Sequence, residues 1–131
     1  MIIAGTNDLT KAVYTTGVVD EYEVVKHVRA IGDAARIRGA KKIHVSGILV
    51  RWGHQYKNAI NRVNNLLQAM CSEQNFYYMD QGDITTDHIS GDGIHPNFHG
   101  TTILKHNILS VFNSFNPYLS NFEGDYEKAM F

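Results

Sequence analysis

The stretch Ile43–Val50 (IHVSGILV) predicts a strand that is buried on both faces of its sheet. Apolar residues occupy both alternating positions, which is typical of a strand with helices packed above and below it. His44 lies between Ile43 and Val45, and we interpret it as a strand histidine with a local hydrogen bond. Arg51 opens the exit loop that follows, where we expect a solvated side chain.

Helical patterns flank this strand on both sides. Upstream, Asp20 and Glu23 have the spacing of a capping box, and Gly39 is suited to end the helix. The apolar residues between them recur at helical intervals: Val24, Val28, Ile31 and Ala35. Downstream, residues 57–74 predict a second helix. In that helix, Asn64 is placed to tie down a neighbouring loop.

Further out, two more short strands and one more helix complete the pattern. Residues 76–79 (FYYM) and Ile2–Ala4 predict strands, and a last helix is expected from His99 or Gly100 to Phe115. The order β–α–β–α–β–loop–α indicates an α/β protein with a parallel sheet between two helical layers. We expect one domain over residues 1–115 and a C-terminal tail over 116–131.

Composition limits the class of protein. The chain has 131 residues, 44% hydrophobic and 19% charged, which fits one packed domain. Its net charge of −1 argues against a nucleic-acid partner, because such affinity comes mostly from basic residues. The single cysteine, Cys71, falls in a helical pattern, so we expect a buried and unreactive thiol, with a Cys–His nucleophile pair as the weaker alternative.

Neither a membrane span nor a targeting segment is visible. No apolar run approaches the roughly 20 residues that a spanning helix needs, so we expect no membrane partner. Residues 1–5 lack the basic start and the length of a signal peptide. The sequence identifies no compartment, and a cytoplasmic location is only the default expectation.

The stretch Asp92–Asn97 (DGIHPN) carries the clearest chemistry. An aspartate three residues before a histidine can fold back within one turn, so that its carboxylate accepts the Nδ1–H of His95. That bond leaves Nε2 free to act as a general base. Gly93 permits the tight turn, and Pro96 biases His95 away from the helical conformation.

A second polar cluster is expected at the same place. Residues 5–8 (GTND) follow the first strand, as the Asp92–His95 pair follows the last one. Ligands of open parallel sheets bind at the carboxyl ends of the strands. The topology therefore predicts that the two clusters share one edge of the sheet.

These residues give the chain a resemblance to the SGNH (GDSL) hydrolase superfamily of esterases, lipases and deacetylases. The Gly-Thr-Asn-Asp and Asp-x-x-His-Pro-Asn motifs occur in the family's order, with a β–α–β–α–β run before the second. The resemblance implies a flavodoxin-like α/β/α fold. It also implies that Asn7 donates to the oxyanion, Asp92 orients and His95 is the base. The implied substrate is a small-molecule or carbohydrate acyl ester, with no cofactor.

The chain departs from the family at the nucleophile. The family's Gly-Asp-Ser block occurs nowhere in this sequence, so no nucleophile is assigned and the chain alone is expected to be a poor or inactive esterase. Ser90 is the nearest substitute and an unpromising one. The resemblance further implies a sheet shortened to about three strands. The strand Ile2–Ala4 would then be an exposed edge that allows self-association.

Two other classes of function stay open. One is a non-catalytic module or gene fragment that keeps the SGNH-like architecture. The other is a metal-dependent hydrolase, because the loop 80–99 is rich in carboxylates and histidines. Against a metal, these residues do not lie on a rigid element, and His99 fits a capping or surface role, so no metal ligands are assigned.

Overall fold

The structure is a computed structural model, and it describes residues 20–115. Within these residues, four helical segments and two strands follow one another: α2 (Glu21–Ile37), β1 (His44–Ser46), α3 (His54–Gln74), β2 (Tyr77–Met79), the 3₁₀ helix η1 (Thr86–His88) and α4 (Phe98–Phe115). The expected strand Ile2–Ala4, the cluster at residues 5–8 and the tail at 116–131 lie outside the described residues.

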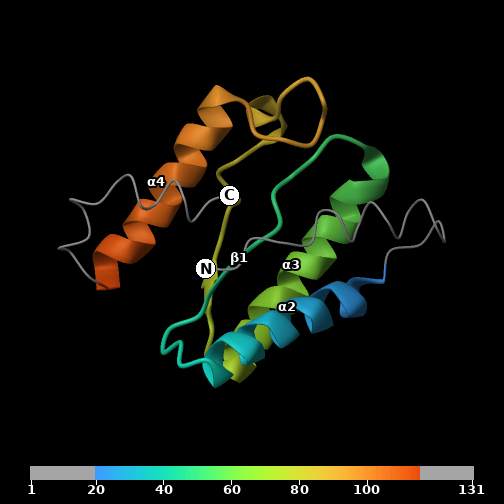
Figure 1. Cartoon of the computed structure of the whole chain (residues 1–131). Helices are drawn as coiled ribbons and strands as arrows, with labels where there is room; N and C mark the ends of the chain where they lie inside the picture. Colours follow the sequence, from blue (N-terminus) through green and yellow to red (C-terminus); the bar gives the residue numbers. More distant parts are fainter. Residues whose placement is uncertain (1–19, 116–131) are drawn as a thin grey trace.

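The two strands form a parallel sheet between helical layers, as predicted (Figure 1). Helices α2 and α3 lie together on one side of the strands, and α4 lies on the other side. Two apolar clusters fill the two interfaces. The larger joins α2 and α3 to Val45 of β1, and the smaller joins α4 to Met79 of β2. The α/β/α architecture is therefore confirmed.

Alternation along the strands explains this division. In the parallel register, Val45 lies opposite Tyr78 and Ser46 lies opposite Met79. Val45 and Tyr78 pack in the α2–α3 cluster, whereas Met79 packs with α4, as expected when successive side chains point to opposite faces. The buried ring of His44 stacks on Tyr77, with ring centroids 5.0 Å apart.

Helix α2 begins as the sequence predicts and packs slightly differently. The Asp20 side chain caps it by accepting the backbone N–H groups of Tyr22 and Glu23. The prediction that Ile31 faces the core is wrong, because its side chain is 48% exposed. The buried position on this side of the helix is Gly32 instead. A Cβ at Gly32 would lie only 2.5 Å from the Phe76 ring. The missing side chain lets this aromatic ring pack against the helix.

Strand β1 is shorter than the predicted stretch 43–50 because a side chain replaces the neighbouring strand. The N–H of Gly47 still donates to the carbonyl of Met79 at 2.9 Å. One residue later, Asn64 of α3 takes over. Its Oδ1 accepts the N–H of Ile48 at 2.7 Å, and its Nδ2 donates to the Ile48 carbonyl at 3.1 Å. The predicted loop-tying role of Asn64 is confirmed.

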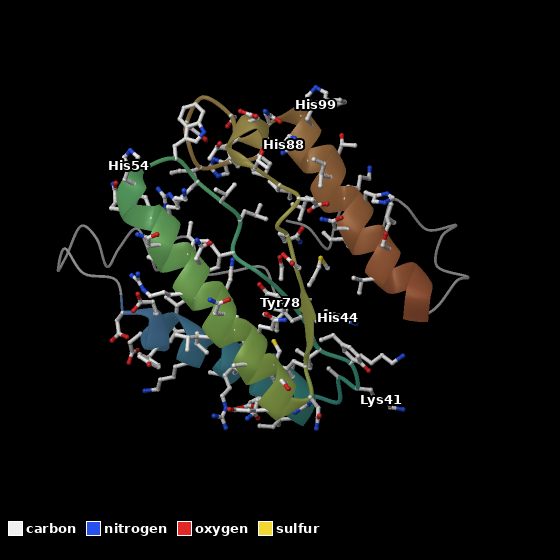
Figure 2. The ribbon with its side chains drawn as sticks, turned by 180° about the vertical axis from the view of Figure 1, so that it is seen from behind. Lys41, His44, His54, Tyr78, His88 and His99 are labelled. Atoms are coloured by element: carbon white, nitrogen blue, oxygen red, sulfur yellow. The ribbon has the colours of Figure 1, made fainter. Side chains whose placement is uncertain are left out.

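Both strands end at the same end of the molecule. In Figure 2, His54, His88 and His99 lie at this end, and Lys41 lies at the opposite end, before β1. Loop 80–97 is thereby placed where ligands of parallel sheets bind. None of the described helices combines the length and the apolar character needed to cross a membrane.

Candidate functional site

Residues 85–97, here called the histidine loop, have a defined structure without a regular strand. They begin with η1, whose cap uses the His88 side chain: Nδ1 accepts the N–H of Thr85 at 2.9 Å. An antiparallel bridge between Ile89 and Pro96 then brings the two arms together. At the far end, the Asn97 N–H donates to the His88 carbonyl at 2.8 Å. The loop is therefore a closed turn that presents residues 90–95.

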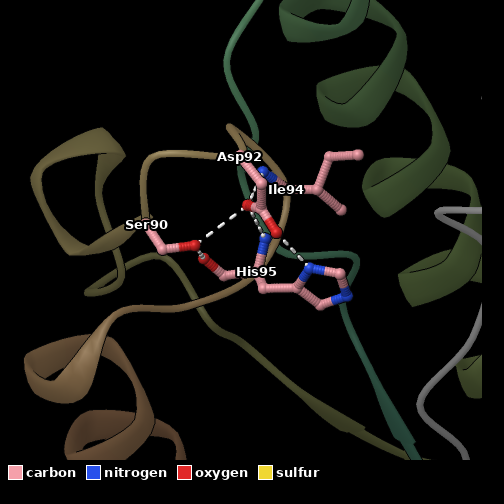
Figure 3. A network of polar contacts seen from close by, with 4 residues as sticks. All are labelled: Ser90, Asp92, Ile94 and His95. Carbon is pink, nitrogen blue, oxygen red and sulfur yellow. Dashed lines mark hydrogen bonds and ion pairs between the residues drawn. The ribbon is translucent and has the colours of Figure 1, made fainter.

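Asp92 organises this turn (Figure 3). Its Oδ1 accepts the backbone N–H groups of Ile94 at 2.8 Å and His95 at 2.9 Å. Its Oδ2 lies 2.5 Å from Nδ1 of His95. The bond from the His95 ring, helped by these backbone N–H groups and by Ser90, holds the pKa of Asp92 well below its ordinary value of 3.8. Asp92 is consequently a carboxylate at neutral pH.

His95 is held by one ring nitrogen and presents the other. An ionised carboxylate only accepts hydrogen bonds, so Nδ1 must carry the proton that bridges to Asp92. The His95 side chain is 75% exposed, and Nε2 points away from the other residues drawn in Figure 3. In the neutral ring, Nε2 is then a lone-pair acceptor, which is the state of a general base. The structure thus brings together the two residues that the sequence paired.

Ser90 does not complete a triad in this arrangement. Its hydroxyl lies 2.9 Å from Oδ1 of Asp92 and 2.9 Å from the carbonyl of His95, on the backbone side of the turn. It therefore braces the carboxylate and does not contact Nε2 of His95. Asn7, the expected oxyanion donor, lies outside the described residues, and its role stays a prediction.

Gly93 gives the turn its shape and its contact with the sheet. Its φ of 75° is the left-handed conformation, which glycine adopts without strain. Its carbonyl accepts the N–H of Trp52 at 2.9 Å. A Cβ at this position would lie 3.2 Å from the Trp52 ring. No motif in the sequence singled out Trp52, although its place in the polar exit loop after β1 could have drawn attention to it.

Arg51 corrects a further expectation. The prediction of a solvated side chain is wrong, because Arg51 is only 7% exposed. Its guanidinium lies 3.9 Å from the centroid of the Tyr56 ring, a cation–π contact at the start of α3. Arg51 and Trp52 line a groove of about 270 Å³ at this edge, together with His54, Lys57 and Thr86.

The acidic and histidine-rich loop does not converge on a metal site in the part of the chain that the structure describes. Within residues 20–115, no three His, Cys, Asp or Glu side chains come together as metal ligands would. Several of them have other partners: Asp80 accepts the N–H of Gly82, Asp83 accepts from Asn107, and His88 caps η1. His99 is exposed at the start of α4, in line with a surface role.

Cys71 behaves as its helical position predicts. Its side chain is 1% exposed, and burial raises the pKa of the thiol to about 11. The thiolate, which is the reactive form, is therefore scarce at neutral pH. A cysteine nucleophile at this position finds no support.

Comparisons with known proteins identify the fold. No protein-family profile and no curated protein matches the chain. Among solved structures, it is similar to a GDSL-like lipase from Bacteroides thetaiotaomicron, with 20% identity over 86% of this chain and a TM-score of 0.69. A proposed acylhydrolase from Bacteroides fragilis gives 20% identity, 87% coverage and a TM-score of 0.68.

A third neighbour is the esterase domain of the ORF1 protein from the zebrafish ZfL2-1 retrotransposon, with 25% identity over 85% of this chain and a TM-score of 0.66. The chain spans 60% of the length of each bacterial structure and 66% of the zebrafish domain. The topology, the place of the histidine loop and these similarities agree: the chain has the SGNH (GDSL) hydrolase-like fold.

Proposed function

We propose that this domain supplies the general base of SGNH-type ester hydrolysis. In a site completed by a nucleophilic serine, His95 Nε2 would take the proton of the serine hydroxyl as it attacks an ester carbonyl, and Asp92 would orient the imidazole and stabilise its charged form. The observation that carries the proposal is the 2.5 Å contact between Nδ1 and Oδ2, which leaves an exposed Nε2 at the ligand-binding edge of the sheet. The fold shared with GDSL-like enzymes supports it.

The proposed mechanism also needs an oxyanion donor and a nucleophile. Asn7 is proposed to donate to the oxyanion, a kind of contact worth about 2.7–4 kcal/mol of transition-state stabilisation. No residue of this sequence is proposed as nucleophile, because it contains no Gly-Asp-Ser. Loss of the nucleophile in a serine hydrolase costs on the order of 10⁶ in turnover. The chain by itself is thus proposed to be inactive or nearly so.

For the substrate we propose a small-molecule or carbohydrate acyl ester. A second groove of about 730 Å³ runs along α3, and its lining combines amide and hydroxyl side chains, among them Asn61, Asn65 and Gln68, with apolar residues and the charged Lys57 and Asp80. It shares Val50, Lys57 and Thr86 with the smaller groove beside Trp52. Neutral hydrogen-bonding groups of this kind suit a polar, uncharged ligand.

A direct test of activity compares the wild type with His95→Ala on short acyl esters. We expect both proteins to show the same background turnover. Clear turnover that His95→Ala abolishes would overturn the proposal of inactivity and would at the same time support the role of His95.

A test of the base role needs no turnover. Nitrogen-15 NMR of the imidazole ring reports which nitrogen carries the proton in the neutral form. We expect the Nδ1–H tautomer for His95 in the wild type and its loss in Asp92→Ala. His99, exposed on α4, serves as the internal control and should not change. A wild-type His95 with its proton on Nε2 would refute the proposal, because that nitrogen could not then act as base.

The alternative function is a non-catalytic SGNH-like module retained for binding or assembly. The absence of Gly-Asp-Ser from the sequence favours it. An inactive protein whose His95 nevertheless has the Nδ1–H tautomer would fit both proposals. Binding of an acyl ester at the same edge, measured by chemical-shift changes around His95, would then favour the ester-hydrolase proposal over the non-catalytic module.

A further inference from the structure

Trp52, in the segment between β1 and α3, contacts the first arm and the tip of the histidine loop. Its backbone N–H donates to the Gly93 carbonyl at 2.9 Å, at the tip of the turn. Its indole Nε1–H donates to the Thr86 carbonyl at 3.2 Å, on the first arm. Its ring lies against Gly93, where a Cβ would be 3.2 Å from the ring edge and 3.3 Å from the Trp52 Cβ. One residue therefore makes three separate contacts with this loop.

The bonds around Asp92 do not provide such an attachment. They span at most five residues, so they shape the turn without fixing it to the sheet. The Trp52–Thr86 bond spans 34 residues. Asp92 and His95 are also 47% and 75% exposed, so packing contributes little to their position. Burial of Ile84 and Ile89 against α4 anchors the base of the loop, whereas the contacts of Trp52 reach its tip, beside the pair.

We infer that Trp52 is a positioning residue, which holds the Asp92–His95 pair in place by bracing the tip and the first arm of the histidine loop against the end of β1. The inference rests on the proposed function only in treating this pair as the working part of the site. Trp52 and Thr86 also line the 270 Å³ groove, so the brace forms part of the wall that a ligand there would contact.

The first test uses the full chain and two substitutions. Trp52→Ala removes the ring and the indole bond, and Trp52→Phe removes the indole N–H but keeps a ring over Gly93. We measure the orientation of residues 90–95 relative to the strands from residual dipolar couplings, together with the solvent exchange of the His95 Nδ1 proton and the titration of the Asp92 carboxyl by NMR. Tyr22→Ala, which deletes a 74% exposed aromatic side chain on α2, is the matched control.

For Trp52→Ala, we expect proton exchange to be about fivefold to tenfold faster, as for an opening favoured by the loss of one hydrogen bond. The Asp92 midpoint should rise toward its ordinary value of 3.8. Trp52→Phe should show a smaller change in the same direction, and Tyr22→Ala none. Wild-type residual dipolar couplings, exchange and titration in either folded Trp52 variant would overturn the inference. Trp52→Phe keeps the test decisive if Trp52→Ala does not fold.

The second test isolates the ring contact. Gly93→Ala is introduced into the wild type and into Trp52→Phe and Trp52→Ala. The cost of the left-handed conformation is common to all three backgrounds. The 3.2 Å approach to the ring exists only where a ring remains, whereas the 3.3 Å approach to the Cβ of residue 52 is common to all three backgrounds. Gly93→Ala should thus lower the melting temperature more in the wild type than in Trp52→Ala, and equal shifts would overturn the inference.

The outcome is separable from that of the proposed function. Every measurement concerns the geometry of the pair, which is present or absent regardless of turnover. A wrong tautomer of His95 would refute the base role and leave the effect of Trp52 on the loop intact. An unaffected pair in the Trp52 variants would refute the positioning role and leave the base role intact.

Discussion

The core beneath β1 and the histidine loop above it are stabilised in opposite ways. In the core, Val63 and Leu67 have 0% exposed area and make no polar contacts with their side chains. In the loop, Asp92 and His95 are largely exposed and are held by four hydrogen bonds to one carboxylate. Burial gives the core its free energy of folding, whereas directional bonds give the loop its geometry.

This difference separates stability from the arrangement of the site. A fully buried leucine contributes a few kcal/mol, while a hydrogen bond at the surface contributes about 0.5–1.5 kcal/mol net. Substitutions in the core should therefore change how much protein is folded without changing the pair in the molecules that remain folded. Substitutions in the loop should do the reverse, and the following predictions test that separation.

The largest effect is expected from Leu67→Ala. Truncation of this fully buried side chain should lower the free energy of unfolding by about 2–5 kcal/mol, through lost burial and a cavity. Urea denaturation measures it, with the exposed neighbour Gln68→Ala as control. The His95 Nδ1 proton should keep its wild-type chemical shift in the folded fraction. A changed shift would show that the core and the loop are coupled.

Gly100, in the first turn of α4, lies where this helix packs against the histidine loop. A Cβ at this position would be 2.3 Å from the His88 carbonyl oxygen, so α4 and the loop would have to move apart. For Gly100→Ala, we expect a loss of about 1–3 kcal/mol and a displaced loop. Gly91→Ala is the control, because nothing lies within 4 Å of its Cβ. Comparable melting temperatures for the two variants would contradict this close approach.

Asn64→Ala removes the two hydrogen bonds that the Asn64 amide makes with the backbone of Ile48, just after β1. Both backbone groups of Ile48 would lose their partner, at a cost of about 1–3 kcal/mol. Asn65→Ala, an exposed amide next in the chain, provides the matched comparison in thermal unfolding. Equal stability of the two variants would mean that water replaces the Asn64 amide.

The smallest effect concerns pH. The pKa of Asp92 is lowered in the folded protein, so its contribution to stability is complete above the unfolded value and is lost as the pH falls through the folded one. Urea unfolding between pH 2 and 6 should show an acid decline below about pH 4 that is shallower in Asp92→Asn. Carboxyl NMR should find wild-type Asp92 still ionised at pH 3.5. Identical slopes for the two proteins would contradict the lowered pKa.

The sequence predicts the contacts that are local. Asp20 caps the helix that follows it, and Asp92 folds back onto His95, because each partner lies within three residues. The alternation of strand and helix patterns along the chain likewise predicts the parallel α/β/α layers. Asn64 was predictable only in outline: its place on α3 suggested that it holds a loop, but not that Ile48 is its partner.

Contacts across long stretches of sequence were not predictable in the same way. Ile31 looked as apolar as its neighbours, but Phe76 packs at Gly32 and leaves Ile31 outside. The burial of Arg51 was also not predicted, although the ring that it contacts, Tyr56, is only five residues further along the chain. Trp52 meets Gly93 only because the ends of two parallel strands share an edge. These cases depend on tertiary packing, which overrides local preference.

The short reach of the bonds around Asp92 also bears on how the molecule folds. Segments whose contacts are close in the sequence pay little loop-closure entropy and form early and fast, whereas parallel strand pairing across a helix is slow. The β1–β2 pairing joins residues His44 and Tyr77, with α3 between them. The turn that carries His95 can accordingly form transiently before the sheet does, and the segment after β1 packs against it once β1 and β2 have paired.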